Sequence, residues 1–505
     1  MLSAAGKPIF ESISCANSTN RDAFEDDTEQ DESTISSICA LVQATMVNVQ
    51  GYIYGGSTEI SVDDSECNND NAIAVLRSND SIIYAMVQGP LIFVAVQYYA
   101  KHIFIENDDG DRVSETSSSS SRRCCCHTEA YMRLILEYLY AQILFTLTDQ
   151  VRSILEESAN FDVRSMLGPD TEALMHGIIH QARDSGDCAT LLTSSVQVVA
   201  LEPSVRDKTY SILRENIQGA LYALLLLENR IVCFIQPKRL DLQLKSCDLH
   251  LILNFVKHQA VALSKTESWL PMCLPRFNAS GNLFAYSNYL HPESKISILL
   301  LSAQNDTSQF NLFHNNFEII RERFQLNDVE CSSPILSDVK RSSKEAHESR
   351  MKGYCLVGNV NHFMYRRDIS IPSSLSSCGG KFTQSLSFSL GGKSDEPLQQ
   401  RGWIMYEKLA LRLRYVEHNI FLKGSDCFSA QILFESIPVD DDLVSYIEDN
   451  AELYMGIRGS DYELFATFNG SISPIDAESH CRQLVERLID DEDTLFITKN
   501  CIWNT

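Results

Sequence analysis

The sequence lacks the short patterns by which most enzymes and metal-binding modules are recognised. No CxxC pair occurs among its 16 cysteines, and no GxSxG string is present. Gly392-Lys393-Ser394 ends like a phosphate-binding loop, but Ser387 stands where that motif needs glycine, so we interpret the segment as a flexible loop. His176 and His180 lie four residues apart on an expected helix, without the glutamate of a zinc-protease motif. We therefore expect no cofactor, no metal and no catalytic side-chain chemistry.

Long apolar runs and an excess of basic residues are also missing. The longest candidates for a membrane span are residues 220–227 and 91–96, whereas a spanning helix needs about 20 apolar residues. The 42 basic and 67 acidic residues give a net charge of −25, which argues against a nucleic-acid binder. The first residues do not resemble a signal peptide, so we expect a cytoplasmic chain with reduced thiols.

The most reactive-looking cluster is Cys124-Cys125-Cys126-His127, which follows Arg122-Arg123 and a run of serines. Two arginines could favour the thiolate form. Incidental composition of a low-complexity insert, reversible palmitoylation and metal binding all remain open for this cluster.

The length and the order of the patterns predict three α+β domains. A chain of 505 residues corresponds to about three domains at roughly 150 residues each. Hairpin-connected strands and a few helices recur three times along the chain. We place the domains at 1–185, 190–330 and 351–505, with a linker at 331–350 and a disordered, serine-rich insert at about 106–126.

Periodicity gives the expected elements within these domains. Apolar residues at helical spacing predict helices at 33–49, 129–158, 170–183, 204–216, 248–263, 310–324 and 476–489, with a further helix beginning at 407. Short apolar runs predict strands at 72–76, 81–87, 91–96, 221–227, 231–236, 283–289, 296–302, 354–359, 362–366, 452–457, 462–468 and 494–497. Residues 375–397, rich in serine and glycine, are interpreted as a loop.

Three stretches of the chain carry a specific resemblance. They are residues 5–10 (AGKPIF), Ser204-Val205-Arg206-Asp207 together with Asp248, His250 and Asn254, and the string WLPMCLPRFN at 269–278 followed by Gly281. Together they resemble the vacuolar fusion protein Mon-one family, and the third stretch is the most specific. Tyr406-Glu407-Lys408 and residues 452–454 extend the likeness into the last third of the chain.

The resemblance implies three longin-like domains, each a small, mostly antiparallel sheet sandwiched by helices. It also implies a partner, a second tri-longin protein of the Ccz-one type, and a joint activity as guanine-nucleotide exchange factor for the late-endosomal Rab GTPase, Rab-seven. Recruitment would come from the early-endosomal GTPase, Rab-five, and from phosphatidylinositol 3-phosphate membranes. The expected location is cytoplasmic and peripheral on late endosomes and the vacuole or lysosome. Such exchange works by differential binding and needs no nucleophile.

The same resemblance suggests two sites. The exchange surface and partner interface would lie in the first domain, on the helix that carries Ile35, Ile38, Val42, Thr45 and Val49 and on the meander 72–96. These apolar residues would equally suit packing on their own sheet. The contact with the recruiting GTPase would lie in the second domain.

For that second site we single out Trp269, Leu274 and Phe277. An exposed tryptophan would suit a partner contact, whereas a buried one would attach the loop to the sheet.

Two departures from the family bear on the first domain. Most of the strand expected ahead of the Gly6-Lys7-Pro8 turn is missing, which suggests a truncated gene model or a short isoform, and the insert 106–126 is additional. These departures keep a second hypothesis open, a longin-based tethering or scaffold subunit without exchange activity.

Overall fold

The computed structural model describes residues 1–3, 9–10, 12, 73–77, 81–98, 127–158, 161–184, 188–228, 230–237, 239–263, 266–291, 295–324, 337, 339, 341, 351–371, 380–389, 400–415, 443–449, 452–498 and 502–503. The predicted helix 33–49 and the insert 106–126 lie outside these residues. Within them, helices cover three sheets whose longer strands all pair antiparallel. The predicted α+β class with longin-like sheets is confirmed.

The first sheet has the order β1-β4-β3-β2 and contains the predicted meander. Its strands are β1 (Leu2–Ser3), β2 (Ile73–Arg77), β3 (Ser81–Gln88) and β4 (Leu91–Tyr98). Gly89, with φ of +55°, begins the two-residue turn between β3 and β4, a backbone conformation that favours glycine. Tyr84, Met86 and Phe93 share a buried cluster with residues of helix α3 (Glu129–Leu147), so one face of the sheet packs on this helix.

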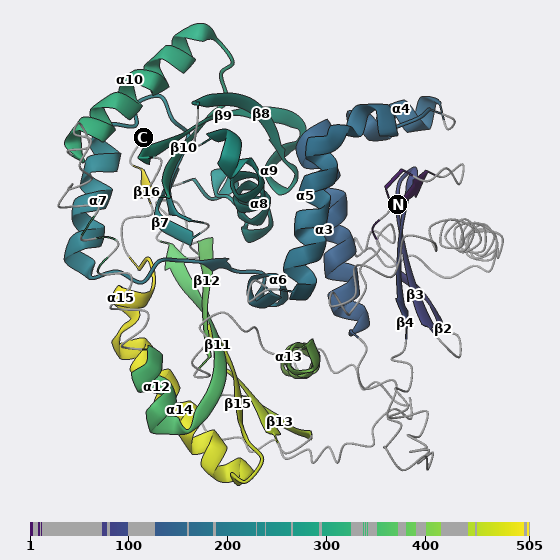
Figure 1. Cartoon of the computed structure of the whole chain (residues 1–505), viewed down its shortest axis with the longest axis vertical. Helices are drawn as coiled ribbons and strands as arrows, with labels where there is room; N and C mark the ends of the chain where they lie inside the picture. Colours follow the sequence, from purple (N-terminus) through teal and green to yellow (C-terminus); the bar gives the residue numbers. More distant parts are fainter. Residues whose placement is uncertain are drawn as a thin grey trace, which may run out of the picture.

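The second sheet has the order β16-β7-β6-β10-β9-β8. Its strands are β6 (Tyr222–Leu227), β7 (Arg230–Pro237), β8 (Ser268–Leu274), β9 (Ala279–His291), β10 (Ile296–Ser302) and β16 (Ile502–Trp503). Leu224 and Leu226 point to the face covered by α8 (Ser246–Leu263), whereas Ala223 and Leu225 point to the face covered by α7 (Pro203–Glu215) and α10 (Thr307–Arg323). Both faces are covered, so β6 is an uninterrupted apolar strand (Figure 1).

The third sheet has the order β13-β14-β15-β11-β12-β5. Its strands are β5 (Val196–Gln197), β11 (Val360–Ile371), β12 (Gly380–Ser389), β13 (Leu443–Asp449), β14 (Glu452–Arg458) and β15 (Tyr462–Asn469). Helices α12 (Met351–Gly358) and α14 (Pro474–Asp490) pack on one face, and α13 (Gln400–Tyr415) packs on the other (Figure 1). Ser473 caps α14 through Asp476 N–H, with Pro474 in the first turn, as expected for a helix start.

The remaining helices complete the described structure. They are α4 (Gln150–Glu157), α5 (Arg164–Asp184), α6 (Cys188–Thr193), the 3-10 turn η3 (Leu240–Leu242), α9 (Pro275–Asn278) and α15 (Glu492–Leu495). Gly168, at φ +56°, interrupts the span of α5 just before Pro169, which agrees with the helix predicted from residue 170.

Two two-residue strands connect the second and third sheets. Strand β5 pairs in parallel with Gln384 and Ser385 of β12, and the next residue, Val198, bridges to Ile231 of β7. Strand β16 pairs in parallel with the end of β7. Each sheet is therefore completed by a strand from outside the predicted span of its domain, and the limits 1–185, 190–330 and 351–505 stay predictions.

Three local predictions are wrong. Residues 354–359, predicted as a strand, belong largely to helix α12, because Met351, Tyr354 and Cys355 form a buried stripe at helical spacing. The predicted loop 375–397 contains β12, where pairing with β11 outweighs the weak strand propensity of serine and glycine. The predicted strand 494–497 overlaps α15 instead.

One hydrophobic cluster includes residues of all three sheets and the helices between them. It contains Phe93 of the first sheet, Leu224 of the second and Met364 of the third. Helices α3 and α5 lie between the first and second sheets (Figure 1). The relative positions of the sheets are therefore set by a shared core.

Candidate functional site

Trp269 lies on β8, the edge strand of the second sheet, and is only partly exposed. Its ring stacks on Phe284, with 6.0 Å between centroids, and meets Phe310 and Phe313 of α10 edge-on at 6.1 and 5.9 Å. Its Nε1–H donates to Asn305 Oδ1 at 3.2 Å. The side chain therefore fixes α10 to the sheet and keeps part of its surface exposed.

The other two residues of the predicted GTPase contact lie deeper. Leu274 is 1% exposed and belongs to the shared core, and Phe277 is half-buried with its ring edge-on to Tyr222. Successive side chains of a strand point to opposite faces. Trp269 accordingly packs on the α7 and α10 side, whereas Met272 and Leu274 pack on the α8 side. The structure does not bring the three side chains together on one surface.

A small polar cluster borders Trp269. The Glu267 carboxylate accepts hydrogen bonds from Tyr286 Oη at 2.7 Å and from His314 Nδ1 at 2.8 Å. Burial by itself would raise the pKa of Glu267, but these two hydrogen bonds lower it overall. The carboxylate thus stays charged beside His314, near the middle of α10.

The residues predicted for the exchange surface, Ile35, Ile38, Val42, Thr45 and Val49, lie outside the described residues. The described part of that predicted site is the meander β2–β4. Its face turned away from α3 carries a small apolar cluster of Ile83, Ala85 and Ile92, flanked by partly buried Leu76, Val87, Val94 and Val96. The assignment of this region to exchange stays a prediction.

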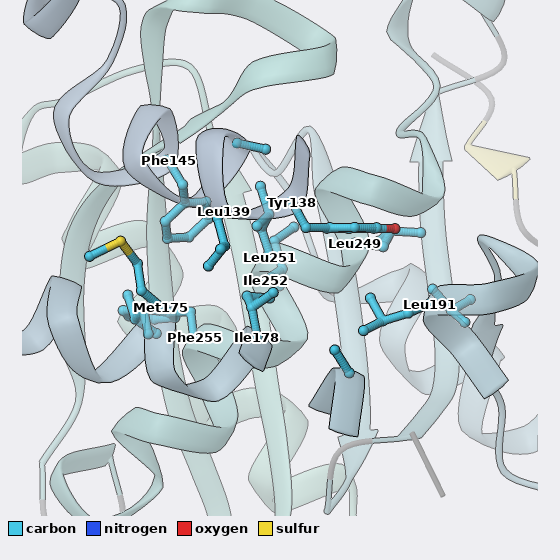
Figure 2. Packing of buried hydrophobic residues seen from close by; sticks show 14 of the residues in the cluster. Tyr138, Leu139, Phe145, Met175, Ile178, Leu191, Leu249, Leu251, Ile252 and Phe255 are labelled. Carbon is cyan, nitrogen blue, oxygen red and sulfur yellow. The ribbon is translucent and has the colours of Figure 1, made fainter. Parts of the chain in front are cut away.

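The motif residues of α8 form polar contacts between helices of the core. Nε2–H of His250 donates to the Ser195 carbonyl oxygen, so Nδ1 is the acceptor and takes the hydrogen bond of Tyr138 Oη at 2.5 Å. Asn254 donates to Gln142 Oε1 at 3.0 Å and to the Leu174 carbonyl. Figure 2 shows the apolar side chains of α3, α5, α6 and α8 that surround these contacts.

Asp248 of the same motif lies in the first turn of α8 and contacts the start of α9. Its Oδ1 accepts the backbone N–H of Arg276 at 3.1 Å, and its side chain is fully buried. Burial raises the pKa of Asp248 to about 6, against the opposing effect of the Arg276 and Phe277 backbone hydrogen bonds. This carboxyl orders the turn that follows Leu274.

Arg206, from the other half of that motif, connects the second sheet with the end of the third. The guanidinium is buried and donates to the carbonyl oxygens of Val232 at 3.1 Å, Val199 at 2.9 Å and Thr494 at 3.2 Å. Arg206 belongs to one of the stretches that carry the resemblance, but the sequence alone assigned it no role. The available signal was a charged residue on the same helix as the apolar Val205 and Tyr210. It would have indicated a buried arginine with satisfied donors, since arginine is rarely buried otherwise.

No group of three potential metal ligands converges anywhere in the described ranges. Among the helices that the structure describes, none is long and apolar enough to cross a membrane. Burial raises the pKa of the free thiols of Cys233, Cys273 and Cys355 to about 12, so these cysteines are unreactive core residues. What this region offers chemically is a rigid aromatic and acidic surface.

Comparison with known proteins shows what the second sheet resembles. Residues 218–316 match the model of the second longin domain of FUZ, MON1 and HPS1. Protein SAND of Takifugu rubripes is 30% identical over 241 residues, 46% of this chain and 42% of the relative. Vacuolar fusion protein MON1 of Yarrowia lipolytica is 26% identical over 324 residues, 63% of this chain and 51% of the relative.

The human vacuolar fusion protein MON1 homolog A is 30% identical over 171 residues, 34% of this chain and 25% of the relative. The chain thus spans about half or less of the length of these relatives. The matched segment 218–316 runs from the loop before β6 into α10 and includes Trp269. The resemblance found in the sequence is confirmed: residues 218–316 are similar to the second longin domain of FUZ, MON1 and HPS1, and the relatives include proteins named vacuolar fusion protein MON1.

Proposed function

We propose that this chain is a subunit of a heterodimeric guanine-nucleotide exchange factor that activates the late-endosomal Rab GTPase, Rab-seven, in vesicle trafficking and vacuole or lysosome fusion. Its partner is a tri-longin protein of the Ccz-one type. The observation that carries the proposal is the match of residues 218–316 to the second longin domain of MON1, together with relatives named vacuolar fusion proteins.

The physical requirements of exchange suit such a chain. The factor must bind the nucleotide-free GTPase more tightly than the loaded one, so that binding energy shifts the GTPase towards release. This requires a surface held in one shape rather than a nucleophile or a general base. The shared core and the polar contacts of Arg206, His250 and Asn254 support the rigidity that such a surface needs.

Recruitment to the membrane belongs to the same proposal. A net charge of −25 makes the whole chain a poor binder of anionic lipid by itself. The early-endosomal Rab GTPase would therefore position the complex on membranes that contain phosphatidylinositol 3-phosphate, peripherally on late endosomes and the vacuole or lysosome. The partly exposed ring of Trp269 is the contact that we assign to this GTPase.

The direct test measures release of labelled GDP from the late Rab GTPase. The chain is purified with its Ccz-type partner, and release is followed with the complex, with the partner alone and with an early Rab as substrate control. Acceleration by the complex on the late Rab alone supports the proposal. Release at the intrinsic rate, with a correctly assembled complex, rejects exchange activity and favours the tethering or scaffold function instead.

A further inference from the structure

A single residue, His127, ties the first sheet to the start of helix α3. Its backbone N–H donates to Gln97 Oε1 of β4 at 3.1 Å. Its carbonyl oxygen accepts the hydrogen bond of Tyr84 Oη, from β3, also at 3.1 Å. Any shift of His127 must therefore displace these two strands or break both bonds.

The side chain of His127 reaches the helix on the third sheet. Its Nδ1–H donates to Glu407 Oε1 of α13 at 2.6 Å, and Glu407 Oε2 accepts the backbone N–H of Thr128 at 3.0 Å. The two side chains are only 13% and 2% exposed. These are charge-assisted hydrogen bonds in a place where little water competes.

The same carboxylate occupies the N-terminus of α3. Thr128 is the N-cap of this helix, and its Oγ1 accepts the N–H of Tyr131 at 3.3 Å. A negative charge is favourable at a helix N-terminus, where the first backbone N–H groups lack partners within the helix. Glu407 therefore supplies from another sheet a charge that α3 can use.

Glu407 itself is held in place by its neighbour. Tyr406 Oη meets Thr467 Oγ1 and His362 Nδ1 at 2.9 Å each, on strands β15 and β11 of the third sheet. Hydrogen bonds thus run from the third sheet through Tyr406 and Glu407 of α13 to His127, and from His127 to β3 and β4 of the first sheet.

We propose that Glu407 is a positioning residue through which the third sheet fixes helix α3 and strands β3 and β4 of the first sheet. Its effect on nucleotide exchange rests on the proposed function, but its effect on the first sheet does not. The local alternative is a helix cap that stabilises only the first turn of α3.

Amide hydrogen exchange of the intact chain separates these two roles. Glu407→Gln keeps the shape of the side chain but removes its negative charge and replaces one acceptor oxygen by a donor. With hydrogen bonds to charged groups as a guide, we expect exchange at Thr128 and across β3 and β4 to become about 10- to 100-fold faster. Amides of β10 in the second sheet should keep their rates. Faster exchange confined to residues 128–131 would overturn the proposal.

A second variant and a matched control keep the test decisive. His127→Gln removes the ring but leaves Glu407 charged, and the double variant should be less perturbed than the sum of the two single variants. Additive effects would refute the coupling. Glu156→Gln removes an acid from an exposed pair with Arg152 on α4 and should change none of these rates.

The activity arm uses the assembled complex with the Ccz-type partner. Glu407→Gln should slow GDP release at saturating complex while leaving the affinity between the subunits unchanged. If the wild-type complex itself releases no GDP, the proposed function fails, whereas the hydrogen-exchange result still decides the role of Glu407. A variant could show faster hydrogen exchange at the amides of β3 and β4 and still release GDP at the wild-type rate. The placement of the first sheet would then not matter for nucleotide exchange, and the predicted effect of Glu407 on activity would be wrong.

Discussion

Replacing Arg206 by lysine tests whether the second and third sheets are held together by one guanidinium. The Arg206 side chain is 6% exposed, and its two Nη atoms make three hydrogen bonds to carbonyl oxygens. The accepting residues, Val232, Val199 and Thr494, come from β7, from the segment after β5 and from α15. Lysine keeps the charge but presents it as a point, without the planar fork of arginine.

The expected cost follows from the number of acceptors. The Val199 and Thr494 carbonyl oxygens share the donor nitrogen Nη2, so a lysine ammonium keeps at most these two acceptors and loses Val232. At about 1.5 kcal/mol, the low end for a hydrogen bond to a charged group, the local loss is at least that of one bond. Hydrogen exchange limited by opening of this junction should then accelerate about tenfold or more.

The reporter is the amide of Leu201, which donates to the same Thr494 carbonyl oxygen at 2.8 Å. Its exchange rate is measured in Arg206→Lys and in Arg214→Lys, an exposed arginine on the same helix that should behave as wild type. Equal rates at Leu201 in the two variants would refute the reasoning. Such a result would mean that the pairings of β5 and β16, together with apolar packing, keep the two sheets in place without Arg206.

Three further predictions concern the core motif and the edge strand. Because the folded pKa of Asp248 is raised from 3.8 to about 6, its contribution to stability falls as pH rises through that interval. The unfolding free energy of Asp248→Asn should therefore gain up to about 3 kcal/mol relative to wild type between pH 4 and 6.5. A difference in unfolding free energy that does not change with pH would contradict this. Asn254→Leu leaves Gln142 without its partner and should lower stability by about 2 kcal/mol or more in urea unfolding, with an unchanged midpoint as the refuting result. Trp269→Ala should weaken binding of the early Rab by about tenfold or more while GDP release in solution persists. The control Ile475→Ala truncates an exposed side chain on α14 and should affect neither activity. A loss of both activities in Trp269→Ala would indicate unfolding of the edge strand β8.

Helices with one apolar stripe and strands that are apolar throughout were predicted well from the sequence. The helix expected at 248–263 is α8 (Ser246–Leu263), and the runs expected at 221–227 and 231–236 are β6 and β7. Periodicity reports burial, and in these segments burial is decided by neighbours that are close in the chain. The same reasoning located the meander of the first sheet.

Elements that depend on distant partners could not be predicted in the same way. Two residues of β5 become a strand only because β12 offers an open edge almost 190 residues later in the chain. The side chain of Gln384 also recognises a distant segment, since it exchanges a pair of hydrogen bonds with the backbone of Ile497, 113 residues away. No local pattern around residues 196–197 or 494–497 contains this information.

The site predictions show the same division between local and distant information. The string at 269–278 marks a real feature, but strand alternation separates Trp269 from Leu274, and the surface contains only the former. No strand was predicted at 268–274, and strand geometry would have excluded Leu274 from the contact. Pro271 is compatible with a strand there, because proline is tolerated on an edge strand such as β8.

The short strings that carried the resemblance lie mainly where separate sheets and helices meet. Arg206 connects α7 to Thr494, His250 connects α8 to Ser195 and Tyr138, and Glu407 connects α13 to His127. Each is a buried polar group whose partners come from a different sheet or helix layer, and such a group is costly unless its geometry is satisfied. A sheet that slides or tilts relative to its neighbours would lose several of these bonds at once. Buried polar contacts therefore select one relative placement of the three sheets, which apolar packing alone would leave less sharply defined.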